Sequence, residues 1–181
     1  MNILVSDIWG ITPHLHELAC QLGSETIIHD PYHGDLTSFK NEQQAYYHFM
    51  NNSGVDSYSK SLAELLNYLK TPVNLIGFST GASAIWNLTN RTNQDQIQNA
   101  ICFYGGQIRN ALNVSPKFKT IHIMPSKEEH FDLSAMLHSL KTKPNTEVIR
   151  TEYLHGFMNR CSTNFSEKGF QEYMTFTKES L

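Results

Sequence analysis

A serine lies between two glycines where an apolar run ends, in the stretch LIGFSTGAS at residues 75–83. Gly77, Ser79 and Gly81 fit the pattern G-x-S-x-G, in which small residues let a strand and a helix crowd together around an outward-pointing serine. Such a hydroxyl becomes a nucleophile only when a base removes its proton and donors receive the developing oxyanion. A turn of small residues without chemistry accounts for the pattern equally well. The role of Ser79 therefore depends on partners elsewhere in the chain.

Backbone donors for an oxyanion are expected directly after this serine. The sequence predicts a helix over residues 81–89, and the start of a helix presents free N–H groups and the positive end of its dipole. The backbone N–H of Thr80 is therefore a candidate oxyanion donor.

The base should be a histidine on a loop at the carboxyl end of the sheet, and the chain has nine histidines. His155 opens the stretch HGFMNR directly after the last predicted strand, where Gly156 allows a sharp turn. His14 and His16 lie two residues apart on a predicted helix, so they face different sides and make a poor metal pair. We therefore take His155 as the candidate base and expect no metal site.

An acidic side chain that orients the base should come from the loop after the fifth predicted strand, which reads MPSKEEHFD. Glu128, Glu129 and Asp132 are all candidates, and a solvated loop explains at least one of them. The resulting chain order of serine, acid and histidine is the order of the α/β-hydrolases.

The elements that must position these residues alternate along the whole chain. Apolar runs bounded by turn residues predict strands that are covered on both faces. Apolar residues at i, i+3, i+4 and i+7 predict amphipathic helices between them, the first ended by Gly23. The predicted strands are residues 2–6, 25–29, 73–78, 100–105, 120–124 and 146–153. The helical stripes are Leu15, Leu18, Ala19 and Leu22; Leu62, Leu65, Leu66 and Leu69; Leu133, Met136, Leu137 and Leu140; and Phe170, Tyr173, Met174 and Thr177.

This alternation predicts an α/β fold: a doubly wound, mostly parallel six-stranded sheet with helices on both faces and strand order 2-1-3-4-5-6. In that order the loops after strands one and three flank the topological switch point, where ligands bind. Ser79 follows strand three, and SDIWGIT follows strand one. The 181 residues are expected to form one domain, 1–181, without a separate lid domain. In the long connection 30–57, we expect the aromatic side chains to anchor a helix near residues 43–50 rather than to line a substrate pocket.

Composition excludes several classes of function. A formal net charge of −3 provides no basic field for nucleic acid or an anionic membrane surface. No apolar stretch approaches the roughly 20 residues that a membrane helix needs. The three cysteines show no paired spacing and are interpreted as reduced thiols, so we expect a cytoplasmic protein.

The chain resembles the dienelactone hydrolase branch of the α/β-hydrolases across most of its length. The resemblance rests on pieces that occur in the right order: DIWGITPHLHELACQLG after the oxyanion strand, DPYHG, the elbow GFSTGA, FYGG, and HGFMN around the histidine. Together they imply a minimal α/β-hydrolase fold without a cofactor.

The same resemblance implies roles for individual residues. Ser79 matches the nucleophile, His155 the base and Glu129 the acid, with Glu128 as the alternative acid. The backbone N–H groups of Ile8 and Thr80 match the oxyanion donors. Asp7 matches an acidic residue that contacts the resting nucleophile in the family, which implies an accessory role.

Two departures from the family pattern bear on chemistry. The best-known members have cysteine where this chain has Ser79, so a mechanism tied to a resting thiol does not carry over. The arginines that bind a dienelactone carboxylate have no clear counterpart, since Arg160 is near the site but offset. Dienelactone is therefore not the substrate that we expect.

The sequence thus predicts a serine-dependent hydrolase of a small carboxylic ester, lactone or thioester, acting through an acyl-enzyme. One alternative is a catalytically silent protein of the same fold that serves as an interaction module. A flavodoxin-like binding protein would share the strand order, but it needs a phosphate cradle after strand one. Asp7, Ile8 and Trp9 stand there instead, and the carboxylate would repel a phosphate.

Overall fold

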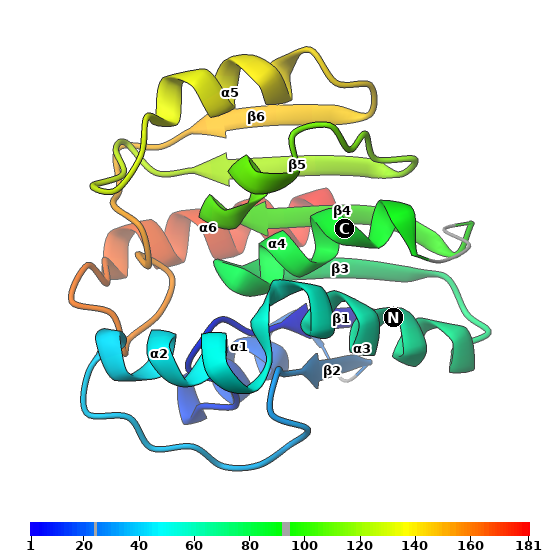
Figure 1. Cartoon of the computed structure of the whole chain (residues 1–181). Helices are drawn as coiled ribbons and strands as arrows, with labels where there is room; N and C mark the ends of the chain where they lie inside the picture. The colour runs from blue at the N-terminus through cyan, green and yellow to red at the C-terminus, as the bar shows by residue number, and fades with distance from the viewer. Residues whose placement is uncertain (24, 92–94) are drawn as a thin grey trace.

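The computed structural model describes residues 1–23, 25–91 and 95–181, and its centre is one parallel sheet (Figure 1). The strand order is β2-β1-β3-β4-β5-β6, which confirms the predicted doubly wound sheet and its order. Every neighbouring pair in the sheet is parallel. The strands are β1 (Asn2–Val5), β2 (Thr26–His29), β3 (Val73–Phe78), β4 (Ile97–Phe103), β5 (Lys119–Met124) and β6 (Thr146–Arg150).

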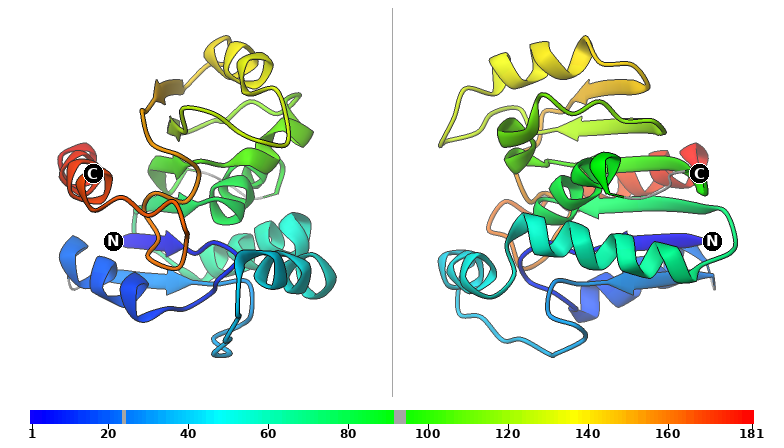
Figure 2. Two further views of the ribbon diagram at one scale, coloured as in Figure 1. Left: turned by 90° about the vertical axis from the view of Figure 1, so that its left-hand side faces the viewer. Right: turned by 45° about the vertical axis from the view of Figure 1, so that its right-hand side comes forward.

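Helices cover both faces of the sheet, as the two views in Figure 2 show. α1 and α6 pack on one face, where their apolar stripes join a core cluster with Leu4, Ile76 and Phe103. α3, α4 and α5 pack on the other face. The helices are α1 (Pro13–Leu22), α2 (Glu42–Asn52), α3 (Gly54–Tyr68), α4 (Thr80–Asn87), α5 (Leu133–Lys141) and α6 (Glu167–Ser180).

Burial follows the position of each strand in the sheet. All six residues of β3 are buried, because this strand has neighbours on both sides and helices on both faces. The edge strands β2 and β6 contain only partly buried or exposed residues. The strand that carries the candidate nucleophile is therefore in the most tightly enclosed part of the fold.

Helix ends follow the chemistry of their capping residues. Thr12 caps α1 by accepting a hydrogen bond from the Leu15 amide at 3.1 Å, and Pro13 occupies the first turn. Gly23 ends α1 with a φ of 110°, which confirms the predicted stop. Asn41 caps α2 in the same way as Thr12 caps α1, accepting from the Gln44 amide at 2.9 Å.

Several boundaries differ from the prediction. β4 begins at Ile97 and not at residue 100, and β6 ends at Arg150 and not at residue 153. Two short 3₁₀ helices, η1 (Leu88–Asn90) and η2 (Gly106–Ala111), were not predicted as such.

α2 is present in the long connection, where Phe49 is fully buried. That burial supports the anchoring interpretation, although Tyr47 on the same helix is exposed. Within the described ranges, no helix is both long and apolar enough to cross a bilayer.

Candidate active site

Ser79 occupies a strained turn between β3 and α4. Its φ of 50° and ψ of −108° lie outside the regions that an ordinary L-residue prefers. The Ser79 amide donates a hydrogen bond to the carbonyl of Phe103 at 2.9 Å, which ties the turn to the end of β4. The turn therefore has the strained strand-to-helix geometry expected of a nucleophile elbow.

The two glycines of the motif are required by close backbone packing. A Cβ atom on Gly77 would lie 2.7 Å from the Ala82 nitrogen, which is too close for any real contact. A Cβ atom on Gly81 would overlap the carbonyl oxygens of Val5 and Ser6 at the end of β1. The elbow is thus pressed directly against the end of β1.

A chain of two hydrogen bonds links Ser79 to His155 and then to Glu128. The Ser79 Oγ lies 3.0 Å from His155 Nε2, and His155 Nδ1 lies 2.8 Å from Glu128 Oε1. A proton on Nδ1 is donated to the carboxylate, which leaves the Nε2 lone pair to accept from the serine hydroxyl. The Glu128 side chain is only 9% exposed, so this carboxylate is well shielded from water.

The expected acid, Glu129, is not the residue that reaches the histidine. Glu129 is exposed, whereas Glu128 makes the contact with His155. The assignment by resemblance was therefore displaced by one residue, and the alternative acid considered from the sequence is the one that the fold brings into place. Asp132 instead caps α5, accepting from the Ser134 amide at 2.8 Å.

His155 is held from two sides. Asn164 Nδ2 donates to the His155 carbonyl at 3.0 Å. The ring of Tyr104, which is fully buried, lies 4.9 Å from the imidazole with the planes tilted by 47°. Gly156 has a φ of 86°, so the sharp turn predicted after the histidine is present.

The two expected oxyanion donors lie on the loops beside Ser79. Thr80 is the first residue of α4, and Ile8 follows β1. Among the residues that the structure describes, no group accepts a hydrogen bond from either backbone N–H. Tyr32 Oη donates to the Ile8 carbonyl at 2.7 Å, which fixes the peptide on that side. Two unoccupied amides therefore remain available next to the nucleophile.

Asp7 makes different contacts from those implied by the resemblance. Its carboxylate accepts a hydrogen bond from the Trp9 amide at 3.0 Å and another from Asn159 Nδ2 at 2.6 Å. No hydrogen bond joins it to Ser79 within the described part of the chain, although both residues line one cavity. Burial raises the pKa of the Asp7 carboxyl above its ordinary value, while the Asn159 hydrogen bond opposes that rise.

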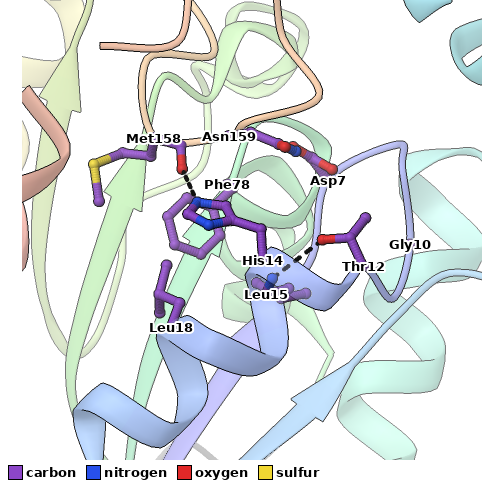
Figure 3. A pocket seen from close by; sticks show the side chains of 9 residues that line it. All are labelled: Asp7, Gly10, Thr12, His14, Leu15, Leu18, Phe78, Met158 and Asn159. Carbon is purple, nitrogen blue, oxygen red and sulfur yellow. Dashed lines mark hydrogen bonds between the residues drawn. The ribbon is translucent and has the colours of Figure 1, made fainter. Parts of the chain in front are cut away.

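The cavity around Ser79 is small, with a volume of about 230 Å³. Besides the residues already described, Trp9, Glu42 and Ser162 line it. None of the described residues in its walls is a lysine or an arginine. A second cavity of about 280 Å³ lies beside it, between α1 and the loops that carry Asp7 and Asn159 (Figure 3). In the described ranges, no group of three His, Cys, Asp or Glu side chains is placed to hold a metal ion.

Three residues of the site were not found by sequence reasoning. Asn159 and Asn164 hold Asp7 and His155, and Tyr104 packs on the imidazole. Asn159 and Tyr104 lie within quoted motifs, HGFMN and FYGG, but nothing in these patterns indicates which way a loop side chain points.

Comparison with known sequences gives one distant relative. No protein-family model matches the chain. The chain is similar to the uncharacterised protein YczH of Bacillus subtilis, with 23% identity over 97% of this chain and 89% of that protein.

Comparison with solved structures shows the fold. The dienelactone hydrolase-like promiscuous phosphotriesterase P91 from metagenomic libraries matches with a TM-score of 0.68 and 13% identity, over 99% of this chain and 84% of its own. Mouse α/β hydrolase domain-containing protein 10 matches with a TM-score of 0.68 and 10% identity, over 99% and 88%. Est1E from Butyrivibrio proteoclasticus, with ferulic acid bound, has a TM-score of 0.65 and 13% identity, over 98% and 88%. The chain therefore has the α/β-hydrolase fold, and its structural likeness includes dienelactone hydrolase-like proteins.

Proposed function

We propose that this protein is a serine hydrolase that cleaves small carboxylic esters, lactones or thioesters through an acyl-enzyme. The observation that carries the proposal is the continuous hydrogen-bonded chain from Ser79 through His155 to Glu128. The strained turn at Ser79 and the unoccupied amides of Ile8 and Thr80 support it. The α/β-hydrolase fold that the chain shares with its structural neighbours is consistent with this chemistry.

In the first step, His155 Nε2 takes the proton of the Ser79 hydroxyl while the oxygen attacks the ester carbonyl carbon. The carbonyl oxygen becomes an oxyanion and accepts hydrogen bonds from the amides of Ile8 and Thr80. When the tetrahedral intermediate collapses, the carbon–oxygen bond to the alcohol breaks, and His155 gives the proton to the leaving alcohol. Glu128 holds the imidazole in the required tautomer and stabilises the imidazolium.

In the second step, His155 removes a proton from water, and the hydroxide attacks the acyl carbon on Ser79. The same amides hold the second oxyanion, and the acid leaves as the proton returns to the serine oxygen. A single well-placed oxyanion donor contributes about 3 kcal/mol to transition-state stabilisation in sites of this kind.

The size and the charge of the cavity favour substrates with small, uncharged acyl groups. The space beside Ser79 is small, about 230 Å³ including the part that is open to solvent. Asp7 and Glu42 contribute carboxyl groups to its wall, and among the described residues that line it no lysine or arginine balances them. A substrate that carries a carboxylate, as dienelactone does, would meet like charge there.

A panel of short-chain esters, lactones and thioesters tests the proposal when it is run with the Ser79→Ala variant. We expect the variant to lose at least about 10³-fold in kcat/KM. Ser134→Ala, the same change at an exposed serine on α5, is the matched control and should keep full activity. Full activity of Ser79→Ala would overturn the proposal.

A fluorophosphonate probe separates the enzyme from a catalytically silent protein of the same fold. An activated Ser79 forms a phosphonyl ester with the probe, and peptide mapping would locate the adduct. An absence of labelling at Ser79 in the folded protein would favour the silent interaction module instead.

A further inference from the structure

We propose that Asn159 is a positioning residue that clamps the loop of the base to the loop of the oxyanion hole. The inference rests on the proposed function, since it concerns how that site is held together. Asn159 lies on the loop after β6, which also carries His155, and Asp7 lies on the loop after β1, next to Ile8. Asn159 Nδ2 donates to Asp7 Oδ2 at 2.6 Å, a bond that spans 152 positions of the sequence. Figure 3 shows the two side chains lying toward one another.

On the oxyanion side, the Asp7 carboxylate closes a turn around Ile8. Its Oδ1 atom accepts from the Trp9 amide at 3.0 Å, and the Asp7 carbonyl accepts from the Gly10 amide at 3.2 Å. Tyr32 holds the Ile8 carbonyl from the opposite side at 2.7 Å. The Asp7 carbonyl, which belongs to the same peptide as the Ile8 N–H, also accepts from Ser6 Oγ at 3.2 Å, so the direction of this N–H depends on how Asp7 is held.

On the base side, Asn159 is itself fixed by two further hydrogen bonds. Its Oδ1 accepts from the Cys161 amide at 2.8 Å, and its backbone N–H donates to the Gly156 carbonyl at 2.9 Å. Because Oδ1 is occupied as an acceptor, Nδ2 must be the atom that faces Asp7. The clamp thus joins two rigid loops and has one orientation.

Loss of the clamp would affect the chemistry in two ways. Asp7 is 7% exposed, so a carboxylate oxygen that loses its donor remains buried without a partner. The loop then keeps its local hydrogen bonds but loses its link to the loop of the base, so the Ile8 amide can shift relative to His155. Asp7 also lines the same cavity as Ser79, so the freed oxygen can compete with His155 for the hydroxyl proton. Both effects act on the chemical step rather than on substrate binding.

A swap of the two side chains is the sharpest test. In the double variant Asp7→Asn/Asn159→Asp, the amide oxygen introduced at position 7 accepts from Trp9. The amide nitrogen at the same position donates to the carboxylate introduced at position 159, whose second oxygen accepts from Cys161. Every hydrogen bond of the clamp is therefore retained. The single variant Asn159→Asp places two carboxylates face to face, and Asn159→Ala removes the donor.

We expect Asn159→Ala and Asn159→Asp to lower kcat about 10- to 100-fold, since small displacements of a catalytic group have effects of this size. KM should change by no more than about threefold, because binding before the chemical step is retained. The swap should recover most of the lost kcat. A swap no more active than the single variants, or an unchanged kcat in Asn159→Ala, would overturn the clamp.

Hydrogen exchange provides a readout that does not depend on catalysis. The amides of Trp9 and Gly10 should exchange faster in Asn159→Ala and regain protection in the swap. If wild type hydrolyses no ester in a Ser79-dependent way, the proposed function fails, and the exchange of these two amides still decides the clamp. If wild type is active but the amides exchange equally in all variants, only the clamp fails.

Discussion

Two neighbouring glutamates have opposite environments at the site. Glu128 is shielded and lies 2.8 Å from His155 Nδ1, whereas Glu129 is exposed. A carboxylate in the first position stabilises the imidazolium that forms in the transition state, and a solvated carboxylate nearby is screened by water. In the proposed mechanism, the two residues therefore differ in function.

We expect Glu128→Gln to lower kcat/KM by about 10²- to 10⁴-fold, because the amide can no longer stabilise the imidazolium or enforce its tautomer. Glu129→Gln, the same change one residue away, should stay within about twofold of wild type. Steady-state kinetics on a short-chain ester checks both variants. Equal losses in the two variants, or a larger loss in Glu129→Gln, would contradict the assignment to Glu128.

At the residue scale, the sequence indicated which types of side chain form the candidate site better than it indicated which residues contact one another. Ser79 and His155 were found because each stands at the end of a strand in a recognisable pattern. Glu128 and Glu129 could not be separated, since an irregular loop has no periodicity that fixes side-chain direction. Asn159 was missed for the same reason, because its role depends on a contact with a residue 152 positions away.

At the scale of elements, the strand-to-helix turn depends on the absence of two Cβ atoms. Gly81 abuts the carbonyl oxygens that end β1, and Gly77 abuts the first turns of α4. These neighbours are backbone atoms of buried elements, so they cannot move aside as a flexible side chain would. The packing of α4 on the sheet is therefore incompatible with any larger residue at either position.

Gly81→Ala should lower the free energy of unfolding by about 3 kcal/mol or more, because the methyl group must displace the backbone at the end of β1. Gly106→Ala is the matched control: its Cβ would lie 3.4 Å from the Phe131 ring, which is an ordinary contact. We expect that control to change stability by less than about 1 kcal/mol. Urea unfolding followed by circular dichroism measures both, and equal effects would refute the packing argument.

The elements themselves were largely predictable. All six strands and their order followed from apolar runs and from the rules for right-handed crossovers. The start of β4 was missed because Gln98 and Asn99 interrupt the apolar run, while β4 still pairs with β3 at Ile97 and Asn99, with a register shift at Gln98. η2 was missed because a 3₁₀ helix of six residues does not show the 3.6-residue periodicity that identifies longer helices.

At the scale of the whole molecule, two histidines link stability to pH. His122 is fully buried on β5, and burial lowers its pKa to about 3. Burial also lowers the pKa of His29, on β2, to about 4. Both remain neutral in the folded protein at pH values where the unfolded chain, with an ordinary histidine pKa near 6.5, binds protons. The unfolded state therefore gains protons as the pH falls, and folding stability decreases from about pH 6.5 toward the folded-state pKa values.

His122→Leu should reduce this pH dependence. Each such histidine contributes up to about 1.4 kcal/mol per pH unit to the slope of the free energy of unfolding against pH. In the variant, the decrease in this free energy between pH 8 and pH 5 should therefore be smaller by an amount of that order. His16→Leu makes the same exchange at an exposed site and should leave the slope as in wild type. Chemical denaturation at several pH values measures it, and parallel curves for wild type and His122→Leu would refute the linkage.

The backbone conformation of Ser79 limits which side chains can occupy this position. A φ of 50° is tolerated by a residue with one heavy atom on Cβ, but a β-branched side chain adds a second atom that crowds the backbone. Serine and cysteine both meet this condition, whereas threonine does not. The turn thus sterically allows either oxygen or sulfur at this position. It excludes threonine, the third small side chain that carries a hydroxyl or thiol group.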